Sequence, residues 1–271
     1  MVNYVDYELF KDYPEVLAAF STKKGGVSKG IYESMNLSLS TADDFENIKE
    51  NYRRFAESLG VLPEQFVISN QKHTTNIRIA TSADKGKGIL KERDYDAVDG
   101  FITNERGLVL CLLFADCVPV YLYDPVKKAI ALVHSGWKGT VQRICQKVLF
   151  VMKSDFGSDA ADVRAVIGPA IGPDSFQVGE EVVQFFKEQG FPLDDIWTFH
   201  PGYTGVPMAD GHHLDLFKAN RWLLEEAGVP AASIQWAGID SYLDQTFFSA
   251  RREGITCGRT ISFIKLLPEH P

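Results

Sequence analysis

The sequence predicts an α+β fold, in the form of a single-domain layered α/β sandwich with a mixed sheet over residues 1–271. Three observations lead to this class. Short apolar runs bounded by turn residues are typical of strands buried on both faces. Amphipathic segments with helical periodicity lie around those runs, without the regular alternation of a doubly wound fold. The 271 residues contain no repeat, low-complexity tract or Pro/Ser-rich linker, which favours one domain.

The middle of the chain carries the densest strand pattern, with turn residues such as Asp124-Pro125 between the runs. We expect strands there and nearer the C-terminus over 108–114, 118–123, 129–133, 163–167, 234–239 and 260–266. Helices are expected over 45–59, where Gly60 ends the periodic segment, and over about 140–153, 179–189 and 214–227. The polar, Gly-rich stretch 82–88 predicts a loop or hairpin tip.

Composition limits the class of partner. The formal net charge is −8, whereas a duplex-binding surface normally needs a basic excess, so we expect no nucleic acid. The first residues, MVNYVDYELF, lack the apolar core of a signal peptide. No apolar run approaches the roughly 20 residues of a membrane span. We therefore expect a cytoplasmic protein that does not enter a membrane.

The four cysteines form no C-x-x-C pair, and in a long cytoplasmic chain they are expected to be free thiols or metal ligands. Cys111 lies in the apolar run 108–114 and Cys145 in an amphipathic helix, so both are expected in the core. Cys257 lies in a turn flanked by glycine, and its role stays open.

The main candidates for metal binding or catalysis are one thiol and two imidazoles, each at the edge of an apolar segment: Cys117, His134 and His73. Cys and His are preferred ligands of zinc and related metals. They also form nucleophile–base pairs. The separations fit no short zinc-finger pattern, but three ligands from separate elements are typical of a catalytic zinc site with an open fourth position. Both interpretations remain open from the pattern alone.

The neighbours of these residues favour a site. Pro119 cannot complete a sheet ladder, so Cys117, next to Asp116, is expected at an interruption of a buried sheet. His134 is expected to end a strand that passes through a Gly-rich turn into a helix. Such a turn presents backbone N–H groups that suit an anion such as phosphate, although the spacing is not that of a Walker loop.

Two basic groups elsewhere in the chain offer anion-binding side chains. One is the Gly-rich turn 23–28, which begins with Lys23; the other contains Arg251, Arg252 and Arg259. Guanidinium groups match phosphate and carboxylate geometry, but each group taken alone is more often a solvated surface turn. The pair His212-His213 is expected on the surface, because adjacent side chains diverge and the pair precedes a helix.

Seven motifs in one order resemble the YfiH/YlmD-like family, also described as laccase-like polyphenol oxidoreductases or purine nucleoside phosphorylases. They run from about residue 20 to about 266: STKKGGVS at 21–28, MNL at 35–37, QKH at 71–73, ADCVP at 115–119, HSGWKG at 134–139, GPAIG at 168–172 and FSARR at 248–252. Each motif is modest alone, but the ordered set is specific. The chain departs from the family at Lys23, where Arg is usual, at 238–241, and at Ala250.

The resemblance implies an α/β sandwich similar to the catalytic domains of deamidating toxins, and a monomer. It implies zinc, with copper as a second possibility, held by His73, Cys117 and His134. The catalytic residues would be these three and Asp116, and Asp99 is a further acid–base candidate. Substrate would be bound by five residues, which are Lys23, Asn36, Gln71, Arg251 and Arg252.

The reaction implied is phosphorolysis of adenosine, inosine, guanosine and methylthioadenosine to base and ribose 1-phosphate, with possible adenosine deamination. Three alternatives stay open. The first is a metal-free Cys117–His134 hydrolase or deamidase, which would not need His73. The second is a copper-dependent polyphenol oxidase, although six histidines are few for a multicopper enzyme. The third is a structural zinc site, which would normally have four protein ligands.

Overall fold

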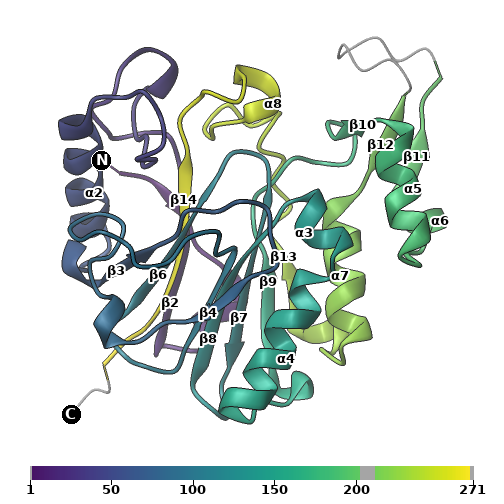
Figure 1. Cartoon of the computed structure of the whole chain (residues 1–271), viewed down its shortest axis with the longest axis horizontal. Helices are drawn as coiled ribbons and strands as arrows, with labels where there is room; N and C mark the ends of the chain where they lie inside the picture. The colour runs from purple at the N-terminus through teal and green to yellow at the C-terminus, as the bar shows by residue number, and fades with distance from the viewer. Residues whose placement is uncertain (1, 202–210, 269–271) are drawn as a thin grey trace.

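The computed structural model describes residues 2–201 and 211–268 and shows a mixed α+β fold in layers (Figure 1). Two sheets stack face to face, and helices cover their outer faces. The α+β class with mixed sheets that the sequence predicts is confirmed. No helix within the described ranges is long and apolar enough to cross a membrane.

The first sheet has five strands, and its order places a C-terminal strand in the middle. The order is β1 (Tyr4–Val5), β2 (Val16–Ser21), β14 (Thr260–Leu266), β6 (Val109–Phe114) and β3 (Phe66–Ile68). β3 and β6 are parallel, whereas the other pairs are antiparallel. The expected strand over 260–266 is confirmed as β14, which pairs with both β2 and β6.

The second sheet has six strands, and the strands expected over 118–123 and 129–133 form an antiparallel hairpin in it. Its order is β13 (Ile234–Trp236), β9 (Arg164–Ile167), β7 (Val118–Asp124), β8 (Ala129–Ser135), β5 (Gly100–Thr103) and β4 (Ile77–Ile79). A separate three-stranded sheet consists of β10 (Gln177–Val178), β12 (His212–Leu214) and β11 (Trp197–Phe199).

Side chains alternate between the two faces of each sheet, and both faces are covered, which explains why these runs are almost continuously apolar. On β7, Val120 packs toward the helices and Tyr121 toward the other sheet. On β6, Leu110 faces the space between the two sheets and Cys111 the helix on the far side. Successive side chains of a strand point to opposite faces, so a strand buried on both faces is apolar at nearly every position.

The helices cover the outer faces of the two large sheets. α2 (Phe45–Ser58) covers the five-stranded sheet, while α3 (Trp137–Val141), α4 (Ile144–Phe156) and α7 (Leu216–Glu226) cover the six-stranded sheet (Figure 1). The remaining α-helices are α1 (Glu8–Lys11), α5 (Glu180–Glu188), α6 (Leu193–Ile196) and α8 (Ala250–Glu253). Short 3-10 helices lie at Gly30–Tyr32, Pro63–Gln65, Ser82–Asp84, Ala160–Asp162 and Ala231–Ser233.

Three local predictions were wrong. The helix expected over 140–153 is two helices, because Arg143 has the left-handed φ of 62° and separates α3 from α4. Pro119 does not mark the break, since it lies inside β7, although the interruption expected at Cys117 is confirmed at 115–117. His213 is not a surface residue: it lies on β12 and is only 1% exposed.

Cysteine placement follows the prediction. Cys111 and Cys145 are buried in the hydrophobic clusters, and Cys257, left open by the sequence, is buried as well. All four thiols are free.

Replacing Leu110 with Ala is expected to lower the free energy of unfolding by about 2–5 kcal/mol, since the change leaves a cavity between the two large sheets. Leu243→Ala is the control: this side chain is 68% exposed, and its loss is expected to cost no more than about 0.5 kcal/mol. Urea denaturation followed by circular dichroism measures both. Equal effects of the two changes would contradict the layered core.

Candidate functional site

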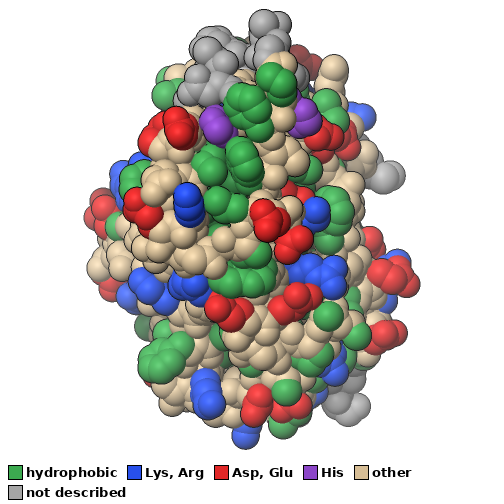
Figure 2. All heavy atoms as spheres, turned by 90° about the vertical axis from the view of Figure 1, so that its right-hand side faces the viewer, with side chains coloured by type: hydrophobic (Ala, Val, Ile, Leu, Met, Phe, Trp, Pro, Cys, Tyr) green, Lys and Arg blue, Asp and Glu red, His purple; other side chains and the backbone are tan. Residues whose placement is uncertain are grey.

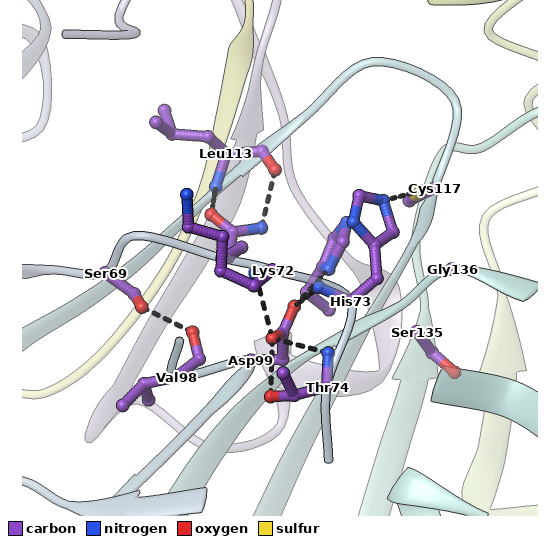
Figure 3. A network of polar contacts seen from close by, with 12 residues as sticks. Ser69, Lys72, His73, Thr74, Val98, Asp99, Leu113, Cys117, Ser135 and Gly136 are labelled. Carbon is purple, nitrogen blue, oxygen red and sulfur yellow. Dashed lines mark hydrogen bonds and ion pairs between the residues drawn. The ribbon is translucent and has the colours of Figure 1, made fainter. Parts of the chain in front are cut away.

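Three side chains from separate parts of the chain come together in space. Figure 3 shows two of them, His73 and Cys117, facing each other. The ligating atoms of His73, Cys117 and His134 lie within 4.8 Å of one another, and Nε2 of His73 is 3.8 Å from Sγ of Cys117. Among residues 2–201 and 211–268, this is the one group of three or more His, Cys, Asp or Glu side chains close enough to share a metal ion. The structure therefore brings together the three side chains that the sequence singled out as candidate metal ligands.

The hairpin of β7 and β8 accounts for two of these positions. Val118 pairs with Ser135 and Pro119 with His134, so Cys117, just before β7, lies beside the end of β8. His73 reaches the same point from the loop between β3 and β4. Its ring is 4.9 Å from the His134 ring, centroid to centroid.

Gly136 leaves the space that the three side chains occupy. A Cβ atom at this position would lie 2.8 Å from Sγ of Cys117 and 3.1 Å from Cδ2 of His73. The first distance is too short for non-bonded atoms, so a side chain here would displace the thiol. Glycine at this position of the turn after β8 therefore leaves room for the Cys117 and His73 side chains.

Asp99 lies beneath the two histidines and is fully buried. Its carboxylate accepts a hydrogen bond from Nδ1 of His134 at 2.8 Å, which leaves Nε2 of that ring for a metal. It also accepts the backbone N–H of His73 at 3.0 Å. The residue just before β5 is therefore linked to both imidazole ligands.

Electrostatics favour a thiolate opposite a cationic imidazole. Loss of hydration opposes ionisation of Cys117, but His134 and His73 outweigh this effect and lower the pKa of the thiol to about 6. Burial disfavours charged His134, yet Cys117 and Asp99 together raise the pKa of the ring. Burial also opposes ionisation of Asp99, but the hydrogen bond from His134 holds its pKa low.

The donor set fits a metal ion. A tetrahedral metal with a thiolate at about 2.3 Å and an imidazole nitrogen at about 2.0 Å holds these two atoms about 3.5 Å apart. The 3.8 Å between Cys117 and His73 is close to that separation. A ligating histidine whose other nitrogen donates to a carboxylate, as His134 does to Asp99, is the usual arrangement at protein metal sites.

Asp116 faces away from the histidines, toward the C-terminal segment. It has a φ of 87°, and its carboxylate accepts hydrogen bonds from Oγ of Ser241 at 2.8 Å and from the backbone N–H of Arg251 at 2.7 Å. Burial raises the pKa of this carboxyl. A residue in an uncommon backbone conformation thus sets the direction in which the next residue, Cys117, enters the site.

Two of the residues expected to bind substrate are held by internal hydrogen bonds. The Gln71 amide pairs with both backbone groups of Leu113, at 2.8 Å each, two residues before His73. Asn36 is fully buried, donates to Thr41 and accepts from the backbone N–H of Arg259. Both side chains fix neighbouring backbone in this structure, and their contact with substrate stays a prediction.

The basic candidates gather around α8. Lys23 is 3.0 Å from Glu253, and both line a cavity of about 460 Å³ that also borders Phe248. Arg252 donates to the carbonyl oxygens of Ser241 and Phe247. The groups at the two ends of the chain, taken separately in the sequence, therefore meet in space.

Arg251 donates to the carbonyl of Gln177 at 2.9 Å, and its own backbone N–H reaches Asp116. Arg259 lies apart from this group and caps carbonyl oxygens of the turn around Cys257. The link from Cys117 through Asp116 to Arg251 is the route by which the C-terminal basic group approaches the three ligands.

Sequence reasoning considered Asp99 only as an acid–base candidate and missed its bonds to both histidine segments. The strand that follows it, β5, was not predicted, and its pairing with β8 and β4 arises only in the folded sheet. The backbone N–H of His134 donates to the carbonyl of Asp99, which fixes the two residues side by side.

Comparisons with known proteins agree with this architecture over nearly the whole chain. The family described as multi-copper polyphenol oxidoreductase laccase matches residues 17–267. A purine nucleoside phosphorylase of Bacteroides thetaiotaomicron is 38% identical over 262 residues, which cover 96% of this chain and 95% of that protein. A protein named adenosine deaminase RL5, from an unknown prokaryotic organism, is 37% identical over 253 residues, covering 92% and 94%.

A solved structure supports the same conclusion. The crystal structure of the Bacillus licheniformis hypothetical protein YfiH matches with a TM-score of 0.87 at 33% identity and covers 94% of each chain. The order of motifs, the fold and the length of the match leave one assignment: the chain belongs to the laccase-like polyphenol oxidoreductase family that includes YfiH.

Proposed function

We propose that this protein is a zinc-dependent purine nucleoside phosphorylase, which converts adenosine, inosine, guanosine or methylthioadenosine and phosphate to the free base and ribose 1-phosphate. The observation that carries the proposal is the group of three candidate ligands in a chain 38% identical, almost end to end, to a protein named purine nucleoside phosphorylase. Three protein ligands with room for a fourth are typical of catalytic rather than structural zinc.

Zinc bound by His73, Cys117 and His134 would supply a Lewis acid with an open coordination position for an oxygen of phosphate or substrate. A thiolate and two imidazoles suit zinc and copper alike. A blue-copper centre normally adds a weak axial ligand, usually methionine. Met35 and Met152 are instead buried in hydrophobic clusters, and the described residues hold one ligand group, not the several that a multicopper oxidase needs. Zinc is therefore preferred.

The residues of the chain would bind phosphate and donate one proton to the leaving purine. Lys23 and Arg251 would hold the phosphate anion. A phosphate oxygen would attack the anomeric carbon of ribose as the bond to the purine nitrogen breaks, and the electron pair of that bond would pass to the base. A proton must then reach the purine, and Asp116 is our candidate donor. Gln71 and Asn36 would support this region through the backbone that they fix.

Adenosine deamination is the second candidate, because a relative of 37% identity carries the name adenosine deaminase. Water instead of phosphate would then be the co-substrate, and ammonia would leave the purine while the glycosidic bond stays intact. The metal-free hydrolase remains the main alternative, since the lowered pKa of Cys117 beside His134 also describes a thiolate nucleophile.

We further propose that the chain acts as a monomeric single domain in the cytoplasm. Acidic and basic side chains are interspersed on the face drawn in Figure 2, without a continuous basic patch that would favour nucleic acid. The net charge of −8 also disfavours binding of nucleic acid.

The decisive experiment is chromatography of adenosine or inosine incubated with zinc-loaded protein, with and without phosphate. We expect phosphate-dependent release of base and ribose 1-phosphate. Cys117→Ala is expected to reduce this rate at least about 100-fold, because even a 1 Å misplacement in an active site costs about that much. Cys111→Ala, which removes a buried thiol from the core cluster, should keep the activity.

Three results would revise the proposal. Inosine formed from adenosine without phosphate would favour deamination. Equal activity of Cys117→Ala and wild type would place the reaction outside this site. No turnover by zinc-loaded protein would leave the cysteine hydrolase as the better hypothesis.

A further inference from the structure

The carboxylate of Asp99 collects five hydrogen bonds in the interior of the protein (Figure 3). Its Oδ1 atom accepts from Nδ1 of His134 at 2.8 Å and from the backbone N–H of His73 at 3.0 Å. Its Oδ2 atom accepts from the backbone N–H of Lys72 at 3.1 Å, and from the backbone N–H and Oγ1 of Thr74 at 2.9 Å each. One side chain thus satisfies three successive amides and one imidazole.

The three amides belong to the loop that carries the first ligand. Residues 72–74 lie in neither a helix nor a strand, and His73 has a φ of 58°, an uncommon conformation for a residue other than glycine. Nothing in a sheet ladder holds this loop, so its three N–H groups depend on Asp99 for their partner. Because all three amides donate to the one buried carboxylate, its position fixes the backbone from which the His73 ring projects.

The second ligand is fixed by the same oxygen. A carboxylate only accepts hydrogen bonds, so the hydrogen between Asp99 and His134 lies on Nδ1 and the lone pair on Nε2 is free for a metal. The backbone N–H of His134 also donates to the carbonyl of Asp99 at 2.8 Å. Both the ring and the backbone of His134 are therefore held by hydrogen bonds to Asp99.

We propose that Asp99 is a positioning residue for the metal centre: it sets the loop of His73 and the orientation of the His134 ring together, so that two of the three ligands are in place before metal binds. This inference rests on the proposed metal site, but it does not depend on which reaction the site performs. It predicts that metal affinity falls when Asp99 changes while all three ligands are kept.

Asp99→Asn is the informative change because it keeps the size of the side chain and removes half of its acceptors. The amide has one oxygen, which can face either the His73–His134 pair or the Lys72–Thr74 pair. Its NH₂ group must then face N–H donors on the other side, where a donor meets a donor. Either the loop or the ring of His134 has to move.

The experiment measures the zinc dissociation constant of the full chain by competition with a chromophoric chelator, with Zn²⁺ alone as the probe. We expect Asp99→Asn to weaken zinc binding about 10- to 100-fold, as loss of an outer-shell partner does at other sites. Cobalt-substituted protein should show an altered visible spectrum, since the geometry around the metal changes.

Asp84→Asn is the matched control. Asp84 is also buried and also accepts a backbone N–H, from Thr81, but its charged partners are Arg78 and Lys87 and none of its bonds involves a ligand. This variant should lower the melting temperature of the zinc-free protein and leave zinc affinity unchanged. If loss of a buried carboxylate acted only through stability, Asp99→Asn and Asp84→Asn would show the same zinc affinity.

Wild-type zinc affinity in folded Asp99→Asn protein would overturn the proposal. If that variant does not fold, Thr74→Val decides, because it removes a hydroxyl whose one hydrogen is shared between Asp99 and the carbonyl of Ala97 and keeps the charge of Asp99: a severalfold loss of zinc affinity supports the proposal and none overturns it. Failure of wild-type protein to bind more zinc than Cys117→Ala would sink the metal site and this proposal together. Normal zinc binding without nucleoside turnover would sink only the proposed reaction.

Discussion

Zinc binding and nucleoside phosphorolysis are expected to disappear together when His73 is replaced by Ala. The change removes one of three ligands, so zinc affinity should fall by more than the roughly 100-fold that loss of an outer-shell partner costs. The zinc content of dialysed protein and the rate of base release from inosine measure the two effects. A joint loss distinguishes the metal-dependent enzyme from a Cys117–His134 hydrolase, in which His73 has no required part.

His212→Ala provides the control for this experiment. His212 lies on β12, accepts a hydrogen bond from Trp197 and does not belong to the three-ligand group. The His212→Ala protein should retain both zinc binding and activity. Activity that survives in zinc-free His73→Ala protein would contradict the proposed function and support thiolate chemistry at Cys117.

Gly136→Ala is expected to disable the site while the rest of the fold stays intact. Its Cβ atom would lie 2.8 Å from Sγ of Cys117, so the thiol has to leave its position. A displacement of about 1 Å lowers the rate about 100-fold. Zinc affinity and the initial rate of phosphorolysis, measured beside the circular dichroism spectrum, test this expectation.

Gly139→Ala is a matched control three residues away. A Cβ atom there has its nearest neighbour at 3.4 Å, the carbonyl oxygen of His134, and alanine suits a helical position better than glycine. We expect near-normal activity and slightly higher stability. If both variants were equally active, the space beside Cys117 would not be essential.

Much of the fold follows from the sequence because its strands are buried on both faces. The runs that became β6, β7 and β8 are largely apolar and lie between turn residues, so local pattern and tertiary environment agree. The break at Arg143 was not predicted, since the apolar period continues across it. The buried His213 was also missed, because β12 is only three residues long and its neighbours in the sheet are distant in sequence.

The site was predicted as a set of residues but not as an arrangement. Cys and His are uncommon enough to be noticed, and His73, Cys117 and His134 do converge. The partners of Asp99 and Asp116 depend on contacts between segments far apart in the chain, such as Asp116 with Arg251. A single sequence carries no pattern for such contacts, because a carboxylate at a strand end looks the same whether it is solvated or buried.

The central position of β14 has a consequence for vectorial synthesis. Until Thr260–Leu266 leave the ribosome, β2 and β6 have no strand between them, and each presents an open apolar edge. Such edges recruit other chains, and synthesis at about 5–20 residues per second keeps them exposed for a finite time. The six-stranded sheet and the candidate ligands His73, Cys117 and His134 precede this strand in the chain, so a nascent chain can bring these three residues together while half of its sandwich is still vulnerable to misassociation.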